Sequence, residues 1–154
     1  MRLRTIAFVT CIVGVPAIVG VFMPVDWYHL PPDIGAAHAE LTWESNETIA
    51  ASRAESDHRP MLIDFGASWC GACQQLEERT FPDPRVREQG ARFVALHVDA
   101  TDDDNPDVAD IREKYHATEG LPVVLLFDSH GAEAVRFTEF VPPDRLSAAM
   151  MRVQ

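Results

Sequence analysis

Residues 61–73 read MLIDFGASWCGAC. An apolar run over 61–65 is typical of a buried strand, and it is followed by Trp69 and by two cysteines, Cys70 and Cys73. Two thiols at this spacing can close a small disulfide ring. If Cys70 opens a helix, the positive end of the helix favours its thiolate and lowers the pKa of its thiol. A reactive thiol with a second thiol beside it is the minimum equipment for thiol–disulfide exchange.

The remainder of the chain alternates between helical and extended patterns. Helices are expected over 46–57, 70–79, 107–115 and 144–152, with a short helical turn over 86–89. Strands are expected over 61–65, 92–98, 122–127 and 134–140. Ser45 is a plausible cap of the first helix. Helical crossovers between strands predict a parallel portion, and a tight turn at 128–131 predicts an antiparallel hairpin. The fold class is therefore α/β, with a mixed sheet flanked by helices.

The charge is strongly acidic. The 154 residues carry a formal net charge of -11, and only Arg2, Arg4, Asp26 and Asp33 lie before Glu40, so the acidic excess belongs to the later part. Such a surface argues against binding nucleic acid or anionic lipid through a basic face. Its simplest consequence is solubility.

No metal or cofactor site is predicted. The six histidines and three cysteines do not show the ligand spacing of a zinc site. The acidic run over 102–104 lacks the alternating ligands and the terminal Glu of a calcium-binding loop. His97 is expected to be a core or edge residue of its strand, and Cys11 to be a small apolar residue in a hydrophobic run.

The N-terminus predicts export. Arg2 and Arg4 precede an uncharged run over 5–25, which is long enough to cross a bilayer and would leave the rest of the chain outside the cytoplasm. The favoured interpretation is an uncleaved anchor in 1–26, a linker in 27–40 and a folded domain in 41–154. The alternative is a signal peptide cut after Ala37-His38-Ala39, which lies further from the run than usual.

Several motifs together resemble the thioredoxin superfamily. They are MLIDF at 61–65, WCGAC at 69–73, TFPDPRV at 80–86, GLP at 120–122 and LFD at 126–128. The segment 80–86 makes the resemblance closer to the C-terminal thioredoxin-like domain of the DsbD thiol:disulfide interchange protein. The resemblance covers about residues 41–152 and implies a thioredoxin-like fold.

The resemblance also implies roles for two thiols and two acids. Cys70 would attack a substrate disulfide and Cys73 would resolve the mixed disulfide, so that Cys70–Cys73 is a redox disulfide rather than a structural one. Asp64 would be a buried acid that relays the proton of Cys73, unless it reaches solvent at the strand end. Glu77 would lie near the site and modulate the thiol pKa, or it is an ordinary solvated helix residue.

A docking surface is implied as well. Pro122 matches the cis-proline of the superfamily and would present the Leu121 backbone to an extended substrate segment. Trp69, Gly71 and Ala72 would line the same surface.

Two positions depart from the family pattern. Ala95 stands where thioredoxins carry a buried lysine near the acid, and Gly66 replaces an aromatic residue that often follows the Asp-Phe pair. Both departures leave the proton relay and the redox potential open.

The activity implied by the resemblance is disulfide reduction outside the cytoplasmic membrane of a bacterium. The clients would be periplasmic oxidoreductases or apocytochromes, and a separate membrane donor of the DsbD/CcdA type would supply the electrons. The chain would be held in the inner membrane through residues 5–25, with its C-terminal domain in the periplasm. The alternatives are a Cu(I)-binding metallochaperone module and a redox-inert interaction domain.

Overall fold

The computed structural model of the chain describes residues 41–102 and 104–154. Its elements are β1 (Trp43–Glu44), α1 (Glu47–Asp57), β2 (Met61–Gly66), α2 (Gly71–Gln75), the π-helical turn η2 (Leu76–Thr80), α3 (Pro84–Gly90), β3 (Val94–Asp99), α4 (Pro106–Lys114), β4 (Val123–Phe127), β5 (Glu133–Phe137) and α5 (Pro143–Met150). The predicted anchor and linker in 1–40 lie outside these residues. Within the described ranges, no helix combines the length and the apolar character that crossing a bilayer requires.

The five strands form one mixed sheet in the order β1-β3-β2-β4-β5. The first three are parallel, and β4 runs antiparallel to both β2 and β5. All six residues of β2 are buried, as a central strand covered on both faces requires. The predicted α/β class, with a parallel portion and a terminal hairpin, is confirmed.

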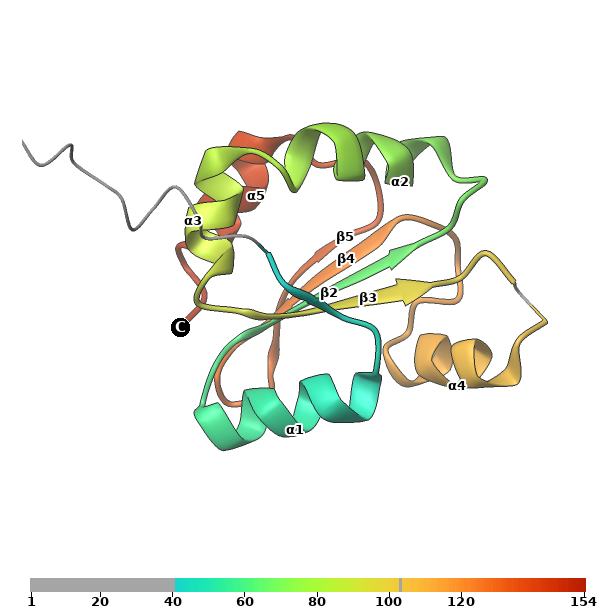
Figure 1. Cartoon of the computed structure of the whole chain (residues 1–154), viewed down its shortest axis with the longest axis horizontal. Coiled ribbons are helices and arrows are strands. Elements are labelled where there is room, and N and C mark those ends of the chain that lie inside the picture. The colour runs from blue at the N-terminus through green and yellow to red at the C-terminus, as the bar shows by residue number, and fades with distance from the viewer. Residues whose placement is uncertain (1–40, 103) are drawn as a thin grey trace, which may run out of the picture. The chain divides into compact units, whose positions relative to one another are not determined.

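Helices cover both faces of the sheet. Figure 1 shows α2, α3 and α5 on one face, and α1 and α4 on the other. Alternate residues of each strand enter the two cores, so Leu62 and Ala95 belong to the core under α2, whereas Ile63 and Leu96 belong to the core over α1. By the same alternation, Asp64 of β2 faces the α2 layer.

The helix boundaries differ from the expectation, and the starts of α1 and α3 are the informative cases. The first helix begins at Glu47 and its cap is Asn46 rather than Ser45, because the Asn46 side chain accepts the Ile49 N–H at 3.0 Å. The expected turn at 86–89 is a complete helix, α3, which Asp83 caps through the Arg85 N–H at 2.9 Å.

The expected helix over 70–79 divides into α2 and η2. The Phe81 N–H bonds to the Leu76 carbonyl, five residues back, at 2.9 Å. This wider turn lets Leu76 and Phe81 enter the same core. Thr80 is also buried, and its hydroxyl donates to the Val141 carbonyl at 2.7 Å.

The strands differ from the expectation as well, most clearly at the two edges of the sheet. The short strand β1 was not expected; it pairs in parallel with Ala95 and Leu96 of β3 and places Trp43 on the sheet edge. The last strand, β5, ends at Phe137 instead of reaching residue 140.

The cap of α1 can be tested directly. Asn46→Ala should lower the free energy of unfolding by about 1 kcal/mol, because the Ile49 N–H loses its acceptor. Ser45→Ala is the matched control and should leave it unchanged. Denaturant unfolding followed by tryptophan fluorescence measures both variants, and equal effects would contradict the assignment of Asn46 as the cap.

Candidate functional site

The two cysteines lie where the chain leaves β2 and enters α2. Cys70 is the N-cap of α2, and its Sγ accepts the Cys73 N–H at 3.2 Å. The two sulfurs form a disulfide, with the Cα atoms 5.2 Å apart. Cys70 is 7% exposed and Cys73 is 2% exposed. The sulfurs are therefore within bonding reach, with Cys70 the outer and Cys73 the inner partner.

Hydrogen bonds from the end of β3 fix the loop before Cys70. Thr101 accepts the Ser68 N–H at its hydroxyl, at 2.9 Å, and the Trp69 ring N–H at its carbonyl, at 3.2 Å. Gln74 donates from α2 to the Ser68 carbonyl at 2.7 Å. Trp69 nevertheless stays 60% exposed. Sequence reasoning missed Thr101, although the carboxyl ends of neighbouring parallel strands necessarily meet.

The loop before β4 reaches the same place. The Leu121–Pro122 peptide bond is cis, as the resemblance implied. Leu121 packs with Ala72 against the small cluster of Ala67, Cys70 and Cys73.

Glycines give this surface its local shape. Gly120 has a φ of 128°, which a residue with a side chain rarely adopts. Gly71 is exposed, and the space beside its Cα is open. With the exposed Trp69 and the partly buried Leu121, the disulfide is thus bordered by apolar groups and accessible backbone.

Asp64 lies beneath this loop, on the α2 side of the sheet. It is 2% exposed, and its Oδ2 lies 3.0 Å from Nδ1 of His97. Its Oδ1 is buried and has no hydrogen-bond partner among the described residues. Burial raises the pKa of the Asp64 carboxyl, and the hydrogen bond and positive charge of His97 act against that rise. The alternative that Asp64 reaches solvent at the strand end is wrong.

His97 is the partner that the sequence did not reveal. It is level with Asp64 in the parallel pairing of β2 and β3, so both side chains lie on one face. Its side chain is 34% exposed, and the centroids of its ring and the Trp43 ring are 6.2 Å apart in an edge-to-face arrangement. The hydrogen bond to Asp64 is the main cause that raises the pKa of His97, although burial opposes it. Glu77 and Asp99 add to the rise through their charges.

Gly66 makes room for this pair. A methyl group at position 66 would lie 3.2 Å from Cε1 of His97, 3.7 Å from Oδ2 of Asp64 and 3.7 Å from Cβ of Cys73. The acid, the imidazole and the inner cysteine therefore surround one point. His97 thus connects the two departures from the family pattern. Its ring occupies the space beside Gly66, and it gives Asp64 the basic partner that Ala95 cannot provide.

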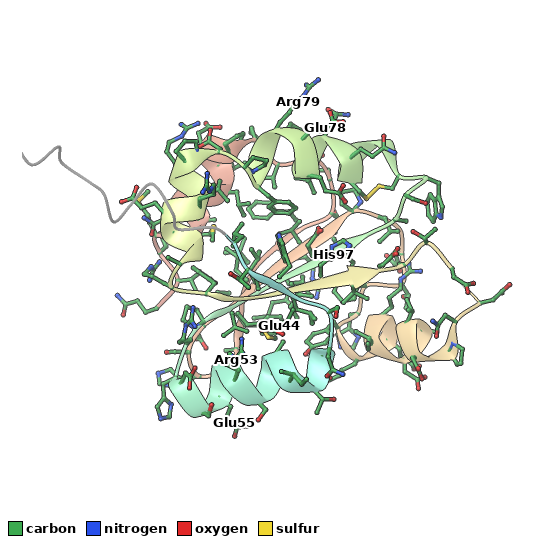
Figure 2. The ribbon with its side chains drawn as sticks, viewed as in Figure 1. Glu44, Arg53, Glu55, Glu78, Arg79 and His97 are labelled. Carbon is green, nitrogen blue, oxygen red and sulfur yellow. A yellow bond between two sulfur atoms is a disulfide. The ribbon has the colours of Figure 1, made fainter. Side chains whose placement is uncertain are left out.

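Glu77 lies on η2 and is exposed. Its negative charge acts on His97, which Figure 2 shows between the sheet and the helical layer of α2. The neighbouring Glu78 and Arg79 point outward from the same turn (Figure 2). In 41–102 and 104–154, no group of three or more His, Cys, Asp or Glu side chains is arranged to hold a metal ion.

Comparisons with known proteins agree with this geometry. A family model described as thioredoxin-like matches residues 42–129. The chain is 35% identical over 127 residues to the thiol:disulfide interchange protein DsbD of Salmonella paratyphi A, covering 80% of this chain and 22% of that protein. It is 38% identical over 96 residues to DsbD of Escherichia coli K12, covering 61% of this chain and 17% of that protein. The chain thus spans about a fifth of the length of these relatives.

Two solved structures show the same fold. The oxidised C-terminal domain of Neisseria meningitidis DsbD superposes with a TM-score of 0.60 at 20% identity, covering 73% of this chain and 100% of that domain. A thioredoxin from Thermus thermophilus gives 0.61 at 24% identity, covering 73% and 86%.

The packing of Gly66 against His97 predicts a coupled effect on stability. Gly66→Ala should lower the free energy of unfolding of the oxidised protein by about 1–2 kcal/mol, because its methyl group crowds the ring. In a His97→Ala background the imidazole ring is absent, so Gly66→Ala should lower the free energy of unfolding much less. Denaturant unfolding of the two single variants and the double variant measures the coupling. Additive losses would show that the ring and Gly66 do not share this space.

Proposed function

The chain belongs to the thioredoxin-like family, and from this premise we propose that it is an extracytoplasmic thiol–disulfide oxidoreductase that works as a protein-disulfide reductase. The observation that carries the proposal is the Cys70–Cys73 disulfide at the start of α2, bordered by exposed Trp69 and by the cis peptide bond before Pro122. Its similarity to DsbD, a thiol:disulfide interchange protein, supports thiol–disulfide exchange as the chemistry.

The proposed reaction begins with the dithiol form. The Cys70 thiolate attacks one sulfur of a client disulfide, a bond forms between them, and the other client sulfur leaves as a thiolate. The Cys73 N–H, which donates to Cys70 Sγ at 3.2 Å, would favour that thiolate. The product is a mixed disulfide between Cys70 and the client.

The second step releases the client. Cys73 gives its proton to the Asp64 carboxylate and attacks Cys70 Sγ, so that the bond to the client breaks and its sulfur leaves as a second thiolate. The client disulfide is reduced to two thiolates, which become thiols on protonation by Asp64 or solvent, and the protein is oxidised to the Cys70–Cys73 disulfide. Asp64 suits this role because it is buried, it lies with the inner cysteine around Gly66, and its Oδ1 accepts no hydrogen bond from the described residues.

Client binding would use the border of the disulfide. An extended client segment would pair with the Leu121 backbone, which Pro122 presents, and would contact Trp69, Gly71 and Ala72. The packing of Leu121 and Ala72 against the cysteine cluster supports this arrangement.

The reducing direction needs a source of electrons. We propose a membrane donor of the DsbD/CcdA type that returns the Cys70–Cys73 disulfide to the dithiol. The clients would be periplasmic oxidoreductases or apocytochromes with their own cysteine pairs. The resemblance to DsbD implies this direction, and the similarity to a thiol:disulfide interchange protein supports the exchange chemistry on which it depends.

Two cysteine variants test the activity. In a Cys11→Ser background, Cys70→Ser should abolish the reduction of insulin disulfides, because no thiolate is left to attack. Cys73→Ala should retain attack but accumulate client proteins as mixed disulfides on Cys70, which non-reducing electrophoresis detects.

Insulin reduction and Cu(I) binding, measured together, distinguish the other candidate functions. An unchanged rate in Cys70→Ser would end the reductase proposal. Stoichiometric Cu(I) binding without any reductase activity would favour a metallochaperone module. Absence of both activities would favour a redox-inert interaction domain.

The location is a second proposal, based on the charged start and the uncharged run over 5–25. An uncleaved anchor predicts that the protein stays with the inner membrane in bacterial cells, is digested by protease added to spheroplasts, and keeps Cys11 in its intact mass. Cleavage after Ala39 predicts a soluble periplasmic protein that begins at Glu40. Membrane fractionation with mass spectrometry of the mature chain distinguishes the two, and a cytoplasmic protein would contradict both.

A further inference from the structure

The pairing of Asp64 with His97 has a consequence for the resolving step. A carboxylate that is 2% exposed is costly to keep ionised, and burial raises its pKa. The proton acceptor of Cys73 must nevertheless be ionised when the mixed disulfide waits to be resolved. Something in this chain has to offset the cost of burying the charge.

Among the described residues, His97 is the hydrogen-bond partner of the Asp64 carboxylate. Its Nδ1 lies 3.0 Å from Oδ2, while Oδ1 has no partner in the same part of the chain. The ring nitrogen can donate to Oδ2 both as a neutral imidazole protonated at Nδ1 and as an imidazolium. One oxygen of the acid is thus occupied by a donor, and the other is available to accept a proton.

The groups around the ring favour its charged form. Three carboxylates act on the His97 ring: Asp64 from β2, Glu77 from η2 and Asp99 from β3. The negative charge of each favours the imidazolium form. From β1 the ring meets Trp43, which carries no charge. Cβ of Cys73 of α2 also lies close to Gly66, and the thiol of this cysteine is the group that the acid would deprotonate.

We propose that His97 is a positioning residue of the resolving step, which holds Asp64 as a carboxylate through Oδ2 so that Oδ1 takes the proton of Cys73. This inference rests on the proposed function, because it assigns a task to His97 within the same reaction. The proton passes from Cys73 Sγ to Asp64 Oδ1, the new Cys73–Cys70 bond forms, and the client sulfur leaves with the electron pair of the broken bond.

Loss of the His97 donor should shift the pH dependence of the resolving step in one direction. Without the donor, Asp64 keeps only the effect of burial, so its protonated form persists to higher pH and the resolving step requires more alkaline conditions. His97→Asn places an amide N–H near the position of Nδ1 and should preserve the carboxylate. His97→Leu removes the donor but fills the space, and so is the matched loss variant.

The test uses the full chain in detergent in a Cys11→Ser background, with 5,5′-dithiobis(2-nitrobenzoate) as a small disulfide. Attack by Cys70 releases one coloured thiolate, and resolution by Cys73 releases the second, so the two steps are observed separately. At pH 7, His97→Leu should slow the second release about tenfold, as expected when a hydrogen bond to a charged group is lost. His97→Asn should restore it to within about threefold of the parent.

The double variant excludes a merely structural role. In an Asp64→Asn background the acid is absent, so His97→Leu should change the second release less than about twofold. In parallel, ¹³C NMR of the Asp64 carboxyl in the oxidised protein should show it titrating at higher pH in His97→Leu than in the parent and in His97→Asn. This measurement does not depend on activity.

The outcomes separate the two proposals. An unmoved Asp64 titration, or an equal slowing by His97→Leu with and without Asp64, would overturn the role of His97. A parent protein that releases only the first thiolate would overturn the proposed resolving reaction, while the NMR titration would still decide whether His97 holds the acid ionised.

Discussion

The rest of the site depends on a carboxylate placed inside an apolar sheet. Asp64 lies in β2, whose apolar side chains pack in the hydrophobic cores, and its own side chain is almost completely buried. A charge in such a place persists only with a donor close by, because burial otherwise raises the pKa of the acid and favours its neutral form. Nδ1 of His97 lies 3.0 Å from Oδ2 of Asp64, and among the described residues Oδ1 has no hydrogen-bond partner. In the proposed resolving step, the oxygen that His97 does not contact is the one that accepts the proton.

Strand direction explains why the site assembles at this edge of the sheet. The strands β2 and β3 are parallel, so their carboxyl ends lie together and bring the loop before Cys70 against Thr101. The strand β4 is antiparallel to β2, and Phe65 is level with Val123, so β4 begins where β2 ends. The segment before it, with the cis bond to Pro122, therefore meets the disulfide. The direction and register of β2, β3 and β4 thus bring three loops together at one edge of the sheet: the loop after β2, the loop after β3 and the loop before β4.

The sequence predicted the structural features that depend on a local pattern of residues or on a complete motif. Apolar periodicity identified the central strands, and the cysteine pair with its flanking residues identified the family that the comparisons show. It could not predict β1, whose two residues form a strand only because β3 offers an edge. The pairing of His97 with Asp64 could not be predicted for a related reason, because it is a property of the register between two strands, which no spacing along the chain expresses. The cis bond came from the resemblance alone, since an isolated sequence favours the trans form.

The departures at Ala95 and Gly66 show how one sheet can meet the same requirement with different side chains. The resemblance implies a lysine where Ala95 stands; this chain has an imidazole two residues later on the same face of β3, and the absence of a side chain at Gly66 leaves space for its ring. The acidic composition then has a local role besides solubility, because Glu77 and Asp99 act on His97 in the direction that favours its cationic form. A lysine is charged at any physiological pH, whereas an imidazole changes its charge near neutrality. The acid of this chain therefore has a basic partner whose charge depends on pH, whereas a lysine would supply a permanent charge.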